Sequence, residues 1–101
     1  MTPTLMVALV NAALRAAGLE HRARYASAED GTVDDEIELV EVEDGVPVGI
    51  QLSDGRFAVN RYERDDDGEV EAVTEEGLFG TLGGAAARAV AVLLGGVDRD
   101  R

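Results

Sequence analysis

The chain has 101 residues, no cysteine, one histidine and a formal net charge of −12 at pH 7. A chain of this length suits one domain, which buries roughly 60–70% of its unfolded surface. Without cysteine there can be no disulfide and no thiolate zinc site, and one histidine is too few for an all-imidazole metal site within one chain. We therefore expect one acidic domain over residues 1–97 and a frayed, charged tail over 98–101.

The N-terminal segment has the pattern of a helix followed by a strand. Apolar residues recur at helical spacing after Pro3, and Gly18 suits the position just beyond a helix end, which predicts a helix over about 4–17. Residues 20–27 alternate apolar and polar side chains and predict a strand, whereas the polar residues 28–35 predict a loop.

The middle of the chain has the turn chemistry of an antiparallel β-meander. Asp44-Gly45 and Asp54-Gly55 each separate two alternating runs, and Asp-Gly favours a two-residue hairpin because both turn positions need a positive φ. Two such hairpins place six apolar residues on one face, in the cross-strand rows Ile37/Leu52/Phe57 and Leu39/Ile50/Val59. A further strand is expected over about 69–74.

The C-terminal segment predicts a second helix. It is expected to begin near Thr81 or Leu82, with Thr81 as its N-cap, and to run to about Leu94 before Gly95-Gly96 ends it. The predicted fold class is α+β, with an N-terminal helix, an antiparallel meander of four or five strands and a C-terminal helix. Both helices are expected on one face of the sheet.

The sequence does not have the features of an exported or membrane-spanning chain. The n-region of a signal peptide is positively charged, but no basic residue precedes Arg15. The longest apolar run, residues 89–94, is too short to cross a bilayer. A cytoplasmic location is the expectation.

The acidic residues are concentrated in the middle of the chain. Eighteen of the 21 lie between Glu29 and Glu76, together with only three of the nine arginines. Such a field repels nucleic acid and anionic membranes and attracts basic proteins. The expected partner is therefore a protein with a basic surface, with no direct nucleic-acid or membrane partner.

The meander face opposite the predicted core has an acidic end and an apolar end. The predicted register puts Glu36 and Glu38 toward one end and Val40, Val42 and Tyr62 toward the other. Two interpretations are open for the apolar end. It is either a docking or dimerisation patch, or it is covered by a second layer such as the first predicted strand.

One acidic run resembles a calcium-binding loop in part. Asp65, Asp67 and Gly68 stand at positions three, five and six of an EF-hand-like loop. Positions one and twelve, however, are Glu63 and Thr74, where an aspartate and a bidentate glutamate belong. The run predicts an acidic hairpin turn, and no metal is expected.

No segment of the sequence carries a catalytic or nucleotide-binding motif. The single histidine is His21, and neither Ser27 nor Ser53 lies in a nucleophile elbow. The glycines before the second helix have the spacing of neither a dinucleotide fingerprint nor a Walker loop. These glycines are Gly77, Gly80, Gly83 and Gly84. We expect a protein that is not an enzyme and binds no cofactor.

The predicted function is a non-enzymatic protein-binding module. Its most concrete form is a small acidic inhibitor of the phage or mobile-element type, a nucleic-acid decoy (anti-restriction or anti-CRISPR-like) that occupies a basic surface of its partner. The predicted partner-binding residues are Glu36, Glu38, Val40, Val42, Tyr62, Asp65, Asp66 and Asp67. The alternative is a dimeric adaptor or secretion-chaperone-like domain that binds an apolar segment through the exposed sheet face. A third interpretation, that the acidity only keeps the domain soluble, also stays open.

Overall fold

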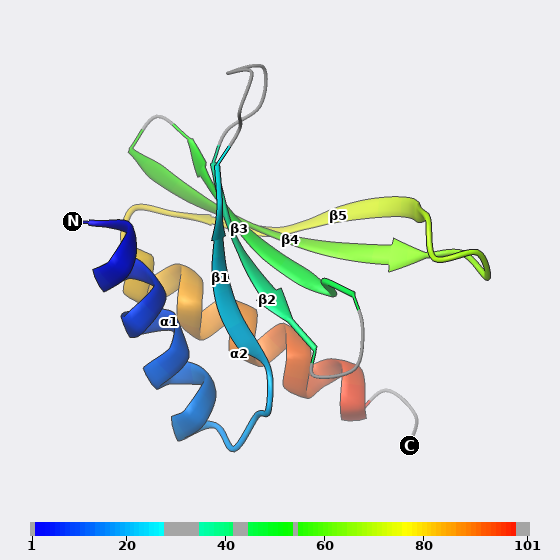
Figure 1. Ribbon diagram of the computed structural model, residues 1–101, viewed down its shortest axis with the longest axis horizontal. Helices are drawn as coiled ribbons and strands as arrows, with labels where there is room; N and C mark the ends of the chain where they lie inside the picture. The colour runs from blue at the N-terminus through cyan, green and yellow to red at the C-terminus, as the bar shows by residue number, and fades with distance from the viewer. Residues whose placement is uncertain (1, 28–34, 42–44, 54, 99–101) are drawn as a thin grey trace.

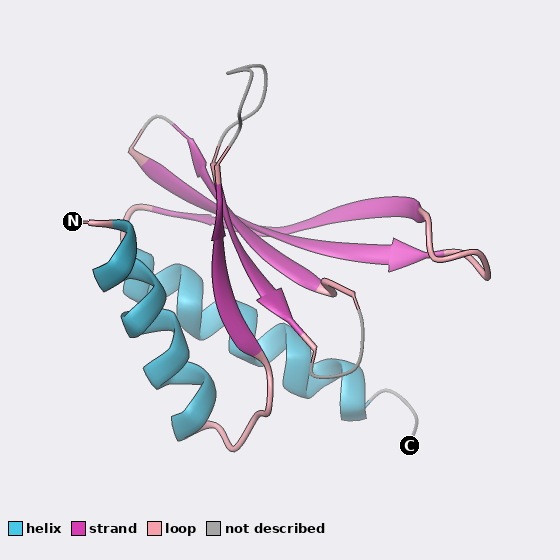
Figure 2. Ribbon diagram, viewed as in Figure 1, coloured by secondary structure: helices cyan, strands magenta, loops and turns pink. Residues whose placement is uncertain are grey.

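The computed structural model describes residues 2–27, 35–41, 45–53 and 55–98. In chain order they form α1 (Pro3–Ala16), β1 (Arg22–Ala26), β2 (Glu36–Val40), β3 (Val48–Ser53), β4 (Arg56–Arg64), β5 (Val70–Phe79) and α2 (Leu82–Asp98). The strands form one antiparallel sheet in the order β1-β2-β3-β4-β5, with both helices on one face (Figure 1 and Figure 2). This architecture confirms the predicted α+β class, and β1 joins the sheet instead of forming a second layer.

Capping chemistry defines both ends of α1. The Thr2 side chain accepts a hydrogen bond from the backbone N–H of Leu5 at 3.2 Å. At the other end, Gly18 has a φ of 74° and the Leu19 N–H donates to the carbonyl of Leu14 at 3.0 Å. This is the Schellman arrangement, which ends the helix and turns Leu19 toward the core.

The β3–β4 hairpin has the predicted register. Leu52 faces Phe57 and Ser53 faces Arg56, as a two-residue loop requires. Gly55 has a φ of 75°, a conformation that glycine adopts readily because it has no Cβ. Asp54, the other residue of the expected turn, lies outside the described residues.

The β2–β3 pairing differs from the predicted register by two residues. Ile37 faces Ile50 instead of Leu52. An even shift leaves every side chain on its original face, so the predicted core face is confirmed. In the predicted cross-strand rows the β3–β4 pairs were right and the β2 residue was wrong. The two-residue turn predicted at Asp44-Gly45 lies partly outside the described residues, as does most of the loop predicted over 28–35.

β5 is longer than predicted. It runs to Phe79, beyond the expected end near Thr74. Asn60 faces Glu75 and Val59 faces Gly77, so Glu76 is an extra residue that makes a bulge, and Gly77 has a φ of 152°. The bulge and the glycine allow the strand to continue beyond its predicted end.

α2 begins as predicted and ends later. The Gly84 N–H donates to Oγ1 of Thr81 at 3.1 Å, which confirms the N-cap. The helix then continues through Gly95 and Gly96 to Asp98, so the predicted end at the glycines was wrong. Each glycine costs about 1 kcal/mol inside a helix, and the packing of the apolar face against the core offsets that cost. Among the described residues no helix is both long and apolar enough to cross a membrane.

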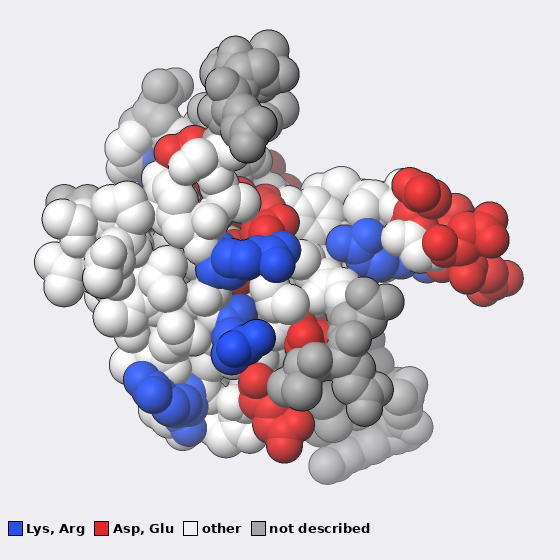
Figure 3. All heavy atoms as spheres, viewed as in Figure 1, with Lys and Arg blue, Asp and Glu red and all other residues white. Residues whose placement is uncertain are grey.

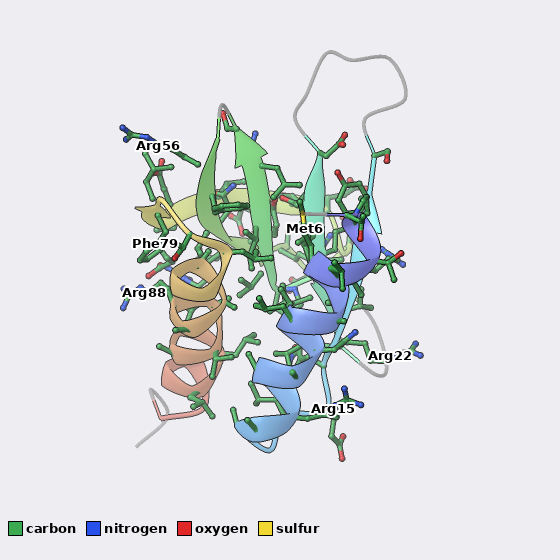
Figure 4. The ribbon with its side chains drawn as sticks, turned by 90° about the vertical axis from the view of Figure 1, so that its left-hand side faces the viewer. Met6, Arg15, Arg22, Arg56, Phe79 and Arg88 are labelled. Carbon is green, nitrogen blue, oxygen red and sulfur yellow. The ribbon has the colours of Figure 1, made fainter. Side chains whose placement is uncertain are left out.

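The core lies between the helices and the sheet. Alanines on α2 permit its close approach to the strands. Figure 4 shows Phe79, the last residue of β5, beside the N-terminal end of α2. It also shows the side chains of four arginines at the surface, Arg15, Arg22, Arg56 and Arg88. The fully buried core cluster consists of Val10, Leu14, Ile37, Leu39, Val48, Ile50, Val59, Leu82, Ala85, Ala86 and Ala89.

Candidate partner-binding surface

The sheet face opposite the helices is centred on Gly49. A Cβ at this position would lie 2.5 Å from the carboxyl carbon of Glu36, so the missing side chain leaves the space that this carboxyl group occupies. The Tyr62 hydroxyl donates a hydrogen bond to Glu36. The contact depends on the observed β2–β3 register, because the two-residue shift brings Glu36 toward the end of the sheet where Tyr62 lies.

The environment of Glu36 alters its titration. Burial raises the pKa of this carboxyl above its ordinary value, the hydrogen bond from Tyr62 lowers it in part, and the charge of Glu38 raises it further. Burial, followed by the hydrogen bond to Glu36, also raises the pKa of Tyr62. Glu36 is half-buried and hydrogen-bonded to Tyr62, so it is not part of an exposed acidic row.

Replacement of this carboxyl by an amide should change how stability depends on pH. The pKa of Glu36 is higher in the folded state than in the unfolded state. Its contribution to the free energy of unfolding is therefore complete below the ordinary pKa of 4.5 and is lost as pH rises through the folded-state pKa. Glu36→Gln removes that loss and keeps an acceptor for Tyr62. We expect the difference in the free energy of unfolding, variant minus parent, to increase as pH rises through this range. The slope should be no more than about 1.4 kcal/mol per pH unit, the limit for one titrating group. Urea denaturation between pH 4 and pH 7.5 measures it, and parallel profiles would contradict it.

The second acid of the predicted acidic end is paired. Arg24 lies directly opposite Glu38 in the β1–β2 ladder, and its Nη2 and Nε atoms lie 2.7 and 3.0 Å from Oε1 of Glu38. Nearby, the Asn60 side chain donates to Gln51 at 3.1 Å. The polar groups at the middle of this face thus bind one another.

The described residues of the predicted apolar end, Val40 and Tyr62, each lie beside an arginine. Val40 lines a recess of about 380 Å³ together with Arg22 and Arg24, and Tyr62 lines another of about 200 Å³ with Arg64. The separation between an acidic and an apolar end was wrong, because Glu36 meets Tyr62 directly. Val42 lies outside the described residues.

The β4–β5 hairpin projects away from the rest of the sheet and carries a group of acids at its tip (Figure 1 and Figure 3). We call this group the acidic arm, defined as Asp65, Asp66, Asp67, Glu69 and Glu71. All five residues are exposed, and none forms an ion pair with any described residue. The arm brings together three of the predicted binding residues and two acids that the prediction left out.

The turn of the acidic arm is shaped by one of its own side chains. Oδ1 of Asp65 accepts hydrogen bonds from the backbone N–H groups of Asp67 and Glu69, each at 3.0 Å. Gly68 has a φ of 84°, and Arg64 donates to its carbonyl at 3.0 Å. The predicted acidic hairpin turn is confirmed. In the part of the chain that the structure describes, no cluster of three or more potential ligands is arranged to hold a metal ion.

An ion-pair network that sequence reasoning missed joins α2 to the sheet. Glu76, the bulged residue of β5, lies 3.1 Å from Arg61 on β4 and 3.3 Å from Arg88 on α2. Arg61 also contacts Glu63 at 2.5 Å, and the hydrogen bonds to Glu63 and Glu76 raise the pKa of Arg61. The partners are far apart in the sequence, so no local pattern predicts their contact.

His21 lacks the partners of a catalytic histidine. Its Nε2 atom lies 3.7 Å from a carboxylate oxygen of Glu41, longer than a hydrogen bond. Both ring nitrogens are buried and have no hydrogen-bond partner among the described residues, so neither Ser27 nor Ser53 is bonded to the imidazole. Within the described part of the chain, the imidazole therefore forms no hydrogen-bonded pair with a nucleophile.

Comparisons with family models, with curated proteins and with solved structures found no match to this chain. The case for a function therefore comes from the surface itself, above all from the different environments of its acids. Some are hydrogen-bonded or ion-paired on the sheet, as for Glu36 and Glu38, and others stand exposed on the acidic arm.

Proposed function

We propose that this protein is a non-enzymatic protein-binding module that docks its acidic arm on a basic surface of its partner. The observation that carries the proposal is that five exposed acids on a projecting hairpin lack a cationic partner among the described residues. Unpaired surface charges of one sign attract and orient a partner of the opposite sign.

The acidic arm is the favoured contact surface because its charges are available. Binding through Glu38 would require the partner to displace Arg24, which lies 2.7 Å away. Binding through Glu36 would break its hydrogen bond with Tyr62. The acids of the arm form no ion pair with the described residues. They can therefore bind a basic group of the partner without breaking an interaction within the protein.

The most concrete form of the proposal is a nucleic-acid decoy. Neighbouring strands lie about 4.8 Å apart and same-face residues recur about every 6.7 Å. The carboxylates of a narrow hairpin therefore lie mostly within a Debye length of about 8 Å of one another. Duplex DNA presents a comparably dense row of negative charge to the basic groove of its binding protein. The favoured partner is thus a nucleic-acid-binding protein, whose groove the arm would occupy.

The proposal is tested by capture from a lysate of the source cells at two salt concentrations. The Debye length falls from about 10 Å at 0.1 M to about 3 Å at 1 M, so a basic partner held by the arm should be retained at the lower concentration and released at the higher. Salt-insensitive capture, or capture of partners without a basic surface, would contradict the proposal.

A matched pair of charge variants locates the contact. Asp66→Asn with Asp67→Asn removes two charges from the arm and leaves the turn-forming Asp65 unchanged. Glu36→Gln with Glu38→Gln removes two charges from the sheet face. We expect the first pair to weaken binding about tenfold, at roughly 0.7 kcal/mol per charge, and the second to change it less than about twofold. Isothermal titration with the captured partner measures both, and the reverse order would place the contact on the sheet face.

A further inference from the structure

The two edges of the sheet differ in how far the fold covers them. At the β1 edge, the Asn11 side chain of α1 accepts a hydrogen bond from the backbone N–H of Ala23 at 2.9 Å, and α1 packs along the strand. At the other edge α2 contacts β5, where Arg88 donates to the carbonyl of Glu76 at 2.9 Å, but β5 has no further strand beside it among the described residues. An uncovered edge presents backbone donors and acceptors to another chain.

The ladder indicates which residues of β5 direct their backbone groups outward. The Tyr62 N–H donates to the carbonyl of Pro47 beside β3, so the backbone groups of its neighbours Arg61 and Glu63 turn toward β5. Their partners on β5 are Thr74 and Ala72. The residues that alternate with these, Val73 and Glu75, therefore direct their N–H and C=O groups to the open edge.

The side chains at this edge combine an apolar centre with acidic flanks. Val73 is 54% exposed, although valine is usually buried in a sheet. Glu71 and Glu75, two residues before and after it, are both exposed and form no ion pair with the described residues. An added strand would meet one apolar position between two negative ones.

Charge repulsion disfavours the binding of a second copy of this chain at the open edge of β5. In an antiparallel pairing of two β5 strands centred on Val73, the acids on either side of Val73 in one copy would approach those of the other. Like charges directly opposite each other destabilise a strand pair, and each copy carries a net charge of −12. A strand with basic residues at those positions would complement the edge.

We infer that the outer edge of β5 binds an extended segment of a basic partner as an added strand, with an apolar residue opposite Val73 and lysine or arginine two residues to either side. The inference rests on the proposed function, because it names the binding mode by which the partner engages the same hairpin. Main-chain hydrogen bonds supply the attachment in this mode, and alternate side chains supply the specificity.

The test uses a synthetic peptide of about ten residues with valine flanked, two residues to either side, by arginine. Its control is the same peptide with N-methyl groups on the amides that would face β5, which keeps the side chains and charge but removes the backbone donors. We expect the unmodified peptide to bind at least about tenfold more tightly, since two hydrogen bonds of ordinary net strength are lost. It should also slow hydrogen exchange at the amides of Val73 and Glu75.

The outcomes separate this inference from the proposed function. Equal, salt-sensitive binding of both peptides would overturn strand addition and leave capture by the acidic arm intact. Binding of neither peptide, while a basic partner is still captured, would also overturn it. Loss of that capture as well would remove the proposed function. A dimer detected by light scattering, with β5 amides protected without peptide, would assign the edge to a second copy.

A protein variant provides an independent measurement. Val73→Pro removes an N–H that points to the open edge and not to β4, so the ladder within the sheet is retained. We expect the variant to keep the parent's circular dichroism spectrum and to bind the peptide at least about tenfold more weakly. Unchanged affinity would overturn the inference. If the variant does not fold, the comparison of the two peptides on the parent protein decides the question.

Discussion

Replacement of Gly77 by alanine is expected to destabilise the fold by about 2–5 kcal/mol. Two effects add at this position. The φ of 152° is one that a residue with a Cβ adopts only with strain, and the added Cβ would lie 2.7 Å from the Phe79 ring. That ring packs against the buried core, so it cannot move away freely. Urea denaturation of the parent and the variant measures the loss.

A neighbouring glycine provides the control for this prediction. A Cβ at Gly80 would meet nothing within 4 Å, and its φ is not in the positive range. Gly80→Ala should therefore change the free energy of unfolding by less than about 0.5 kcal/mol. Equal losses at Gly77 and Gly80 would mean that neither the bulge nor the Phe79 contact constrains this segment.

Truncation of Ile50 is the second change with a large expected effect. Ile50 is 0% exposed at the centre of β3, opposite Ile37 and Val59, which are equally buried. Ile50→Ala removes buried methyl groups and leaves a cavity that the surrounding strands cannot close, at a cost of about 2–5 kcal/mol, whereas Ile50→Val should cost about 0.5–1.5 kcal/mol.

Leu52, the next core-facing residue on β3, is the matched comparison. It is only partly buried, so Leu52→Ala should cost less than Ile50→Ala. Guanidinium denaturation of the variants ranks the sites. A larger loss at Leu52 would indicate that the row Ile37/Leu52/Phe57, as the hairpin signals predicted it, and not Ile37/Ile50/Val59, is the centre of the core.

Local chemistry was sufficient for much of this fold. Gly18 and Thr81 predicted helix boundaries because capping depends on residues within one turn. Asp54-Gly55 predicted the β3–β4 register because a two-residue loop fixes which residues face each other. The alternation along β2 predicted that Ile37 and Leu39 are buried, and both are.

The β2–β3 register could not be predicted from local chemistry. A shift of two residues preserves the alternation that the sequence displays, so the burial pattern is the same in both registers. The choice depends on contacts between distant residues, namely Ile37 with Ile50 and Tyr62 with Glu36. β5 is similar, since Glu76 is stabilised by Arg61 and Arg88, which lie far from it in the sequence.

The candidate binding surface, too, has properties that the sequence determines and properties that only the fold decides. The sequence by itself determined that the protein is strongly acidic and that the acids gather in its middle, because charge is a property of composition and order. Only the tertiary structure decided which acids are available. Pairing requires an arginine or a hydroxyl to approach within a few ångströms, and the fold brings such groups to Glu36, Glu38 and Glu76. The acids of the arm form no such pair among the described residues, because the hairpin projects from the body and its Arg64 binds the carbonyl of Gly68.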